Sequence, residues 1–222
     1  MRGFETSEFA VRTAKAQAMM AKHGLAALLL TTEPDVRYFT GYLTRFWESP
    51  TRPWFLIVPA HGKPVAVIPS IGADLMGQTW IDDIRSWSSP DLSDDGISLL
   101  IDTLKELAPN GLIGVPDGHE THLRMPYRNI ATLAESVEIT TDHGILRALR
   151  MVKSDAEIAK VTHACEIAGR AFSRVPEIAR AGVPLDKIFR DFQILCLEEG
   201  ADWVPYLAGA AEQDGYRDVI SP

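Results

Sequence analysis

The loop at residues 45–54, RFWESPTRPW, combines residue types that recognise small charged ligands. An arginine can bind a carboxylate through paired N–H groups, and a tryptophan ring can line an apolar pocket or face a cation. Arg45, Trp47 and Arg52 are therefore candidates for contact with a substrate or with another subunit. The alternative is structural, with Trp47 packed under the loop and the arginines paired with its glutamate. For Trp54 we prefer a structural role at the start of a core strand.

A second polar stretch, DGHETH at residues 117–122, brings two histidines close together. His119 and His122 stand three residues apart, whereas the HExxH motif of zinc peptidases needs them four apart on one helix face. Pro116 and Gly118 indicate a loop between a strand and a helix. We therefore predict a solvated loop or helix cap here. The sequence also contains no GxSxG, P-loop or GxGxxG motif, so these three chemistries are not indicated.

The composition is that of a globular protein. Of the 222 residues, 46% are hydrophobic and 23% are charged, so disorder is not expected. The net charge of −8 argues against nucleic acid or an anionic membrane as a partner. Cys165 and Cys196 lie in helical patterns without metal spacing and are expected to be buried, reduced thiols. The N-terminus lacks the apolar region of a signal peptide, and we expect a cytoplasmic protein.

Short apolar runs alternate with helical patterns as far as residue 140. This alternation predicts an α/β domain with a mixed sheet covered by helices. Strands are expected at residues 25–31, 54–59, 64–69, 112–116 and 136–140, with a short extended piece at 82–89. Helices are expected at residues 7–22, 34–41, 70–80, 91–108 and 122–134.

The pattern becomes almost entirely helical after about residue 142. Ser154 precedes Glu157 by three residues, which is the spacing of a capping box at the start of a helix. A stripe of apolar or small residues follows at helical spacing: Ile158, Val161, Ala164, Cys165, Ala168, Ala171, Phe172 and Val175. A second helix is expected from residue 184 to 199. These helices predict the start of a second domain whose sheet has barely begun.

Two stretches resemble signatures of the creatinase/prolidase/aminopeptidase P family. LRALRMVKSDAEIAKVTHACEIAGRAF (146–172) resembles the helix that opens the second domain, and PDVRYFTGY (34–42) resembles the family's N-terminal motif. The resemblance covers nearly the whole chain. It implies a creatinase/prolidase-type N-terminal α/β domain at residues 1–143. The residues from 144 to 222 would then be the start of an incomplete pita-bread α+β catalytic domain.

The resemblance also implies an activity for the full-length protein. Family members are dinuclear-metal hydrolases, and we expect an Xaa-Pro dipeptidase that acts on a dipeptide or another small molecule. The two divalent ions, such as Mn, Zn, Co or Fe, would be held by aspartates, glutamates and a histidine downstream of this chain. The chain itself is therefore expected to hold no metal ligand and no catalytic residue, and to be inactive alone. The resemblance further implies a homodimer in which the 45–54 loop faces the catalytic cleft of the other subunit.

The last residues depart from the peptidase branches of the family. Those branches carry a histidine before a Pro-Ser/Thr-Asp run, whereas this chain reads GYRDVISP and has no histidine after His163. Tyr216 is therefore a candidate substrate-binding residue, with a packed strand position as the alternative. The departure leaves open an amidinohydrolase, as in creatinase, or a lyase acting on a small zwitterion. A non-catalytic dimerisation or binding module is a further alternative if the chain is naturally this short.

Overall fold

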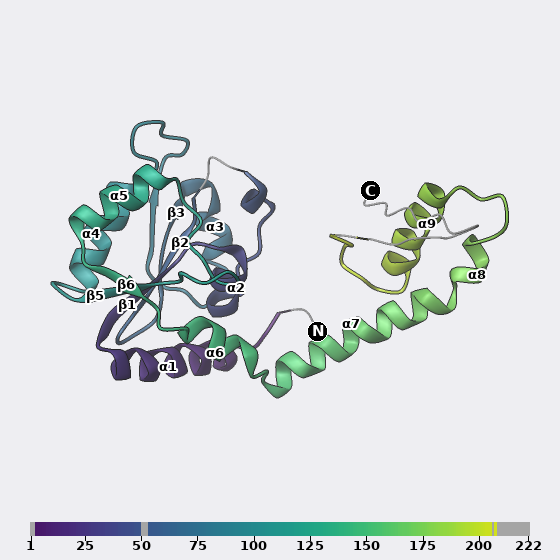
Figure 1. Cartoon of the computed structure of the whole chain (residues 1–222), viewed down its shortest axis with the longest axis horizontal. Coiled ribbons are helices and arrows are strands. Elements are labelled where there is room, and N and C mark those ends of the chain that lie inside the picture. The colour runs from purple at the N-terminus through teal and green to yellow at the C-terminus, as the bar shows by residue number, and fades with distance from the viewer. Residues whose placement is uncertain (1–2, 50–52, 206, 208–222) are drawn as a thin grey trace. The chain divides into compact units, whose positions relative to one another are not determined.

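The computed structural model describes residues 3–49, 53–205 and 207. The chain forms two compact units, Met1–Val152 and Lys153–Pro222. The first unit contains a six-stranded sheet in the order β4-β3-β2-β1-β5-β6 (Figure 1). Its strands are β1 (Leu25–Leu30), β2 (Phe55–Pro59), β3 (Val65–Pro69), β4 (Ile84–Trp87), β5 (Leu112–Val115) and β6 (Ile139–Thr141).

The sheet is mixed, as predicted. Strand β2 is antiparallel to both β1 and β3, whereas the pairs β1–β5, β3–β4 and β5–β6 are parallel. Every strand except β2 therefore runs in the same direction, and their carboxyl ends lie along one edge of the sheet. Strand β2 starts at that same edge because it runs the opposite way. We refer to this edge as the carboxyl edge.

Helices cover both faces of the sheet (Figure 1). One face carries α1 (Thr6–His23), α2 (Glu33–Thr40), α3 (Ala73–Met76) and α6 (Ile145–Met151), and the other carries α4 (Ile97–Leu107) and α5 (Tyr127–Ser136). Successive β1 residues alternate between the two cores, with Leu28 and Leu30 in the first and Ala27 and Leu29 in the second. Because both faces are buried, β1 reads as one continuous apolar run.

Two helices on the second face begin later than the sequence predicted. Helix α4 was expected from residue 91 but begins at Ile97, because the preceding acidic residues form turns in which Asp91 Oδ1 accepts the N–H of Ser93. Helix α5 was expected from residue 122 but begins at Tyr127. The preceding segment is extended there, since His122 forms an isolated bridge with Asp117.

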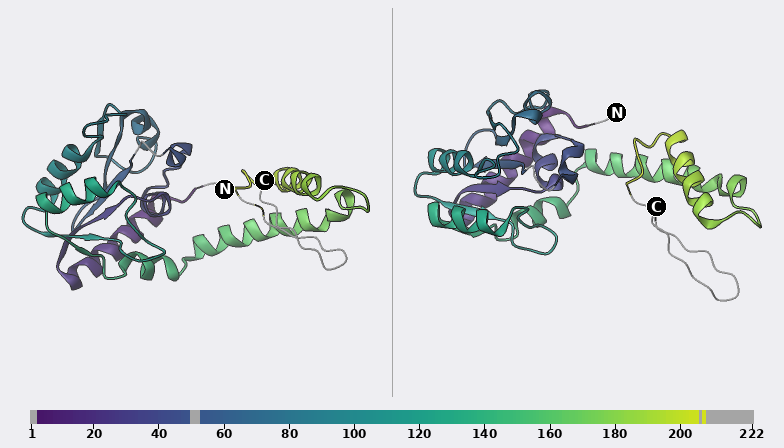
Figure 2. Two further views of the ribbon diagram at one scale, coloured as in Figure 1. Left: turned by 45° about the horizontal axis from the view of Figure 1, so that its top comes forward. Right: turned by 90° about the horizontal axis from the view of Figure 1, so that it is seen from above.

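The second unit is helical in the part that the structure describes. It contains α7 (Asp155–Ser173), α8 (Val175–Ile178) and α9 (Leu185–Glu198), and α9 lies beside α7 (Figure 2). The predicted capping box is confirmed, because Ser154 Oγ accepts the N–H of Glu157 and the Glu157 carboxylate accepts the N–H of Ser154. A small core forms from Ala171, Phe192, Leu195 and Cys196.

The predicted stripe of apolar and small residues lies mostly on α7, and several of its larger side chains are exposed. Ala171 is buried, but Ile158, Val161 and Phe172 are exposed, and the other buried residue of this helix is Ile167. Cys165 is also exposed, contrary to our expectation, because it shares a helix face with Val161.

The first compact unit ends at Val152, whereas the predicted domain limit lies at residue 143. Helix α6 remains with the first unit because Ile145, Leu146 and Leu149 are buried in its core. Among the residues that the structure describes, no helix has both the length and the apolar character needed to span a bilayer.

Candidate functional site

The two motifs singled out in the sequence meet at a buried ion pair. Arg150 Nη1 lies 2.8 Å from Asp35 Oδ1, and the Asp35 side chain is only 1% exposed. The hydroxyl of Thr32 donates to Asp35 Oδ2 at 2.6 Å, and the hydroxyl of Tyr38 donates to the carbonyl of Leu149 at 3.2 Å. These contacts fasten α2 to α6, so both motifs have a structural role in holding the end of the first unit.

The environment of Asp35 opposes its ionisation. Burial raises the pKa of Asp35, and the carboxylate of Asp142 acts in the same direction, while Thr32 and Arg150 partly lower it. Asp142 is itself buried, and its carboxylate accepts the N–H groups of Gly144 and Leu146 at the start of α6. The Asp35–Arg150 pair therefore fixes geometry at the cost of desolvating a carboxylate.

The rest of the 34–42 motif also packs the domain. Gly41 ends α2 with φ = 76°, and a Cβ there would lie 2.8 Å from the ring of Phe9. The hydroxyl of Thr40 donates to the carbonyl of Val36, and the indole N–H of Trp80 donates to the carbonyl of Phe39. The motif is therefore a compact helix and cap that several neighbours hold in place.

The aromatic residues of the 45–54 loop are largely buried. Trp54 is 0% exposed and Trp47 is 6% exposed, with their ring centroids 5.7 Å apart. Tyr42 packs on Trp54 at 5.5 Å, and burial raises the pKa of Tyr42 to about 12. The preferred structural role of Trp54 is confirmed. The ring of Trp47 leaves little surface for a ligand, and its predicted contact with substrate stays a prediction.

The 45–48 turn places Arg45 at the surface. This turn is a 3-10 helix (Arg45–Glu48) that begins where Thr44 Oγ1 accepts the N–H of Phe46. Arg45 Nη1 lies 3.3 Å from Glu48 Oε1, and the Arg45 side chain is 61% exposed. Its predicted role toward a substrate or a second subunit stays a prediction. The other two candidate residues, Arg52 and Tyr216, lie outside the described residues.

The DGHETH stretch forms a loop, as predicted. Asp117 bridges to His122, and the hydroxyl of Thr141 donates to Asp117 Oδ1 at 3.0 Å. No cluster of three or more histidine, cysteine, aspartate or glutamate side chains that could hold a metal ion occurs in the described part of the chain. These residues therefore do not fit the two metal ions that the resemblance implies, and we assign no metal-dependent step to them.

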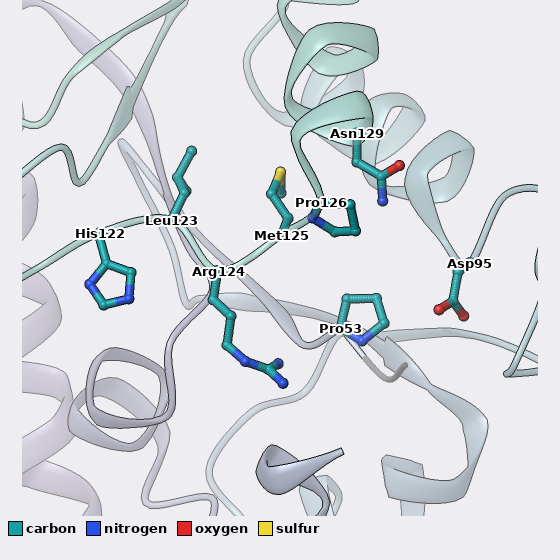
Figure 3. Close-up of a pocket in the computed structure, with 8 residues that line it drawn as sticks. All are labelled: Pro53, Asp95, His122, Leu123, Arg124, Met125, Pro126 and Asn129. Carbon is teal, nitrogen blue, oxygen red and sulfur yellow. The ribbon is translucent and has the colours of Figure 1, made fainter. Parts of the chain in front are cut away.

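A pocket of about 410 Å³ opens at the carboxyl edge of the sheet (Figure 3). Three parts of the chain line it, namely Pro53 shortly before β2, the turn before α4, and the segment that leads into the first turn of α5. Its lining residues are Pro53, Asp95, His122, Leu123, Arg124, Met125, Pro126 and Asn129. Our sequence analysis missed this pocket, because no local spacing links these segments.

A mixed sheet covered on both faces by helices, with two motifs joined by an ion pair, makes the first unit an α/β domain. The chain belongs to the creatinase/prolidase family, because the creatinase/prolidase N-terminal domain model matches residues 12–152. This match confirms the fold class and the resemblance stated above.

Relatives in the family extend beyond this domain. The probable dipeptidase PepE of Mycobacterium tuberculosis (strain ATCC 25618 / H37Rv) is 27% identical over 238 residues, which span 98% of this chain and 57% of the relative. The crystal structure of the dipeptidase PepE from Mycobacterium ulcerans has a TM-score of 0.72 and 26% identity, covering 99% of this chain and 58% of that one. Creatinase of Bacillus sp. (strain B-0618) is 26% identical over an alignment that covers 82% of this chain and 43% of the creatinase chain. The chain thus spans about half the length of these relatives.

Proposed function

We propose that this chain is the N-terminal portion of a dinuclear-metal hydrolase that acts as an Xaa-Pro dipeptidase. The similarity to probable dipeptidases along 98% of the chain is the observation that carries this proposal. In this proposal the metal ligands lie outside the residues that the structure describes, because no cluster there could hold a metal ion. The similarity to creatinase supports a second candidate, an amidinohydrolase on the same scaffold.

The test compares the complete translation product of the gene with the 222-residue chain. We expect the complete product to hydrolyse dipeptides with proline in the second position, and a chelator to abolish this activity. We expect no turnover by the 222-residue chain. Hydrolysis of creatine in place of dipeptides would favour the second candidate. Chelator-sensitive turnover by the 222-residue chain would contradict the proposal, and a stop codon directly after Pro222 would leave a binding module instead.

The 45–48 turn has a proposed role in the same reaction. We place Arg45 against the substrate in the catalytic cleft of the second subunit of a homodimer. Its guanidinium is exposed, and it has the geometry to bind a carboxylate with paired N–H groups. In the complete enzyme, we expect Arg45→Gln to raise KM by about 10-fold or more, since a hydrogen bond between charged groups is lost.

The matched control is Glu48→Gln, which removes the carboxylate that lies 3.3 Å from Arg45 Nη1 and keeps the arginine. We expect this variant to leave KM within about 2-fold of the wild-type value. Light scattering should show a dimer for the complete enzyme and for both variants. An unchanged KM in Arg45→Gln, or a monomeric and fully active enzyme, would argue against this role.

A further inference from the structure

The pocket at the carboxyl edge lies where open α/β sheets commonly bind ligands. After β1 the chain adds β2, β3 and β4 on one side, and it then returns to add β5 and β6 on the other side of β1. Segments that leave adjacent parallel strands in opposite directions open a crevice outside their carboxyl ends. The 122–126 segment follows β5 at this position, and its Arg124 N–H donates to the hydroxyl of Thr31 just after β1.

Arg124 lines this pocket, and hydrogen bonds to neighbouring residues fix its position. Its backbone N–H lies 2.6 Å from Thr31 Oγ1, and its Nη2 donates to the carbonyl of Ser49 at 2.8 Å. Both contacts use uncharged acceptors, and Arg124 forms no ion pair within the described ranges of the chain. The Arg124 side chain is half-buried. Its remaining N–H groups are suited to a carboxylate of a ligand.

Asp95 also lines the pocket, and hydrogen bonds from neighbouring residues fix its carboxylate. Its Oδ1 accepts the indole N–H of Trp87 at 3.1 Å, the hydroxyl of Ser89 at 2.9 Å and the N–H of Asp91 at 3.4 Å. Its second oxygen, Oδ2, has no donor among the residues described here. In Figure 3 the Arg124 guanidinium and the Asp95 carboxylate lie on opposite sides of the Pro53 ring.

We propose that this pocket binds a small zwitterion of amino-acid or dipeptide size, with the ligand carboxylate on Arg124 and the ligand ammonium on Asp95. The volume of about 410 Å³ falls in the range of small-molecule sites. Pro53, Met125 and Pro126 add apolar surface to the lining of the pocket. Because hydrogen bonds already fix both charged side chains, binding costs little side-chain conformational entropy.

The experiment is a titration of the 222-residue chain with glycylglycine, in which calorimetry measures the affinity and NMR measures the shifts of the backbone amides. Acetate and ethylamine serve as probes that carry only one of the two charges. Arg124→Gln keeps the backbone contact with Thr31, and Asp95→Asn keeps an oxygen for its three donors. Arg128→Gln is the matched control, because this exposed arginine of α5 does not line the pocket.

We expect saturable binding of glycylglycine with amide shifts at residues 122–129. Each pocket variant should weaken binding by about 10-fold or more, and each single-charge probe should bind at least about 10-fold more weakly. Arg128→Gln should bind like the wild type. Absence of saturable binding, shifts confined to other residues, or wild-type affinity in Asp95→Asn would overturn the proposal. If Arg124→Gln does not fold, the Asp95→Asn affinity and the wild-type shifts still decide it.

Discussion

Arg150→Met is expected to lower the free energy of unfolding of the first unit by about 3–5 kcal/mol at neutral pH. The substitution keeps an apolar stem but removes the guanidinium that lies 2.8 Å from Asp35 Oδ1. The Asp35 carboxylate is 1% exposed and would retain Thr32 as a hydrogen-bond donor without a cation beside it. A buried charge that loses its partner is among the costly single changes in a protein. Urea unfolding followed by circular dichroism measures the difference.

The pH dependence separates the loss of charge pairing from the loss of packing. Burial already raises the pKa of Asp35, and removing Arg150 takes away one of the influences that lower it. A raised folded-state pKa gives stability that is present below the unfolded-state pKa and is lost as the pH rises through the folded-state pKa. The deficit of Arg150→Met should therefore be small near about pH 4 and grow toward about pH 7. Equal deficits at both values would point to packing instead.

Two further variants control this result. Arg147→Met changes an exposed arginine on the same helix and should alter the free energy of unfolding by less than about 0.5 kcal/mol. Asp35→Asn should cost less than Arg150→Met at neutral pH, because it leaves no buried charge. Arg150 is 35% exposed, so water can solvate it after the loss of Asp35. A larger cost for Asp35→Asn than for Arg150→Met would contradict this account.

The fold was predictable where local patterns have a single explanation. The run LAALLL in β1 is apolar at every position, and only a strand covered on both faces accounts for it in so short a segment. The capping box at Ser154 was also predictable, because both of its hydrogen bonds join residues only three positions apart. The starts of α4 and α5 were misplaced because turns and a bridge compete there with helical spacing.

The contacts that define the site join residues far apart in the sequence. Asp35 and Arg150 were each visible as motif residues, but nothing local shows that their side chains meet. The pocket was even harder to predict from the sequence, because Asp95 and Arg124 come from segments that only the strand order brings together. For Trp47, composition suggested either a ligand wall or a packed ring, and only burial favours packing. Side-chain burial depends on tertiary contacts that residue spacing does not encode.

Trp54→Ala is expected to lower the free energy of unfolding by about 3–5 kcal/mol. Trp54 is fully buried, and its ring packs between Tyr42 and Trp47 at centroid distances of 5.5 and 5.7 Å. The substitution would leave a cavity under the 45–48 turn, because neighbouring side chains fill such a space only in part. Phe46→Ala in the same turn is the matched control and should cost less than about 1 kcal/mol, since Phe46 is exposed.

Substitution of Gly72 tests the same packing by adding atoms beside Trp54 instead of removing them. A Cβ at this position would lie 2.3 Å from Cζ3 and 2.7 Å from Cη2 of Trp54, and 2.6 Å from the hydroxyl of Tyr42, so Gly72→Ala should destabilise by about 1–3 kcal/mol through overpacking. Trp54→Phe removes both of those ring atoms. The double variant should therefore be more stable than the sum of the two single changes predicts, which a double-mutant cycle measures. Simple additivity would mean that contact with the indole of Trp54 does not cause the cost of Gly72→Ala, and would leave the Tyr42 hydroxyl as its cause.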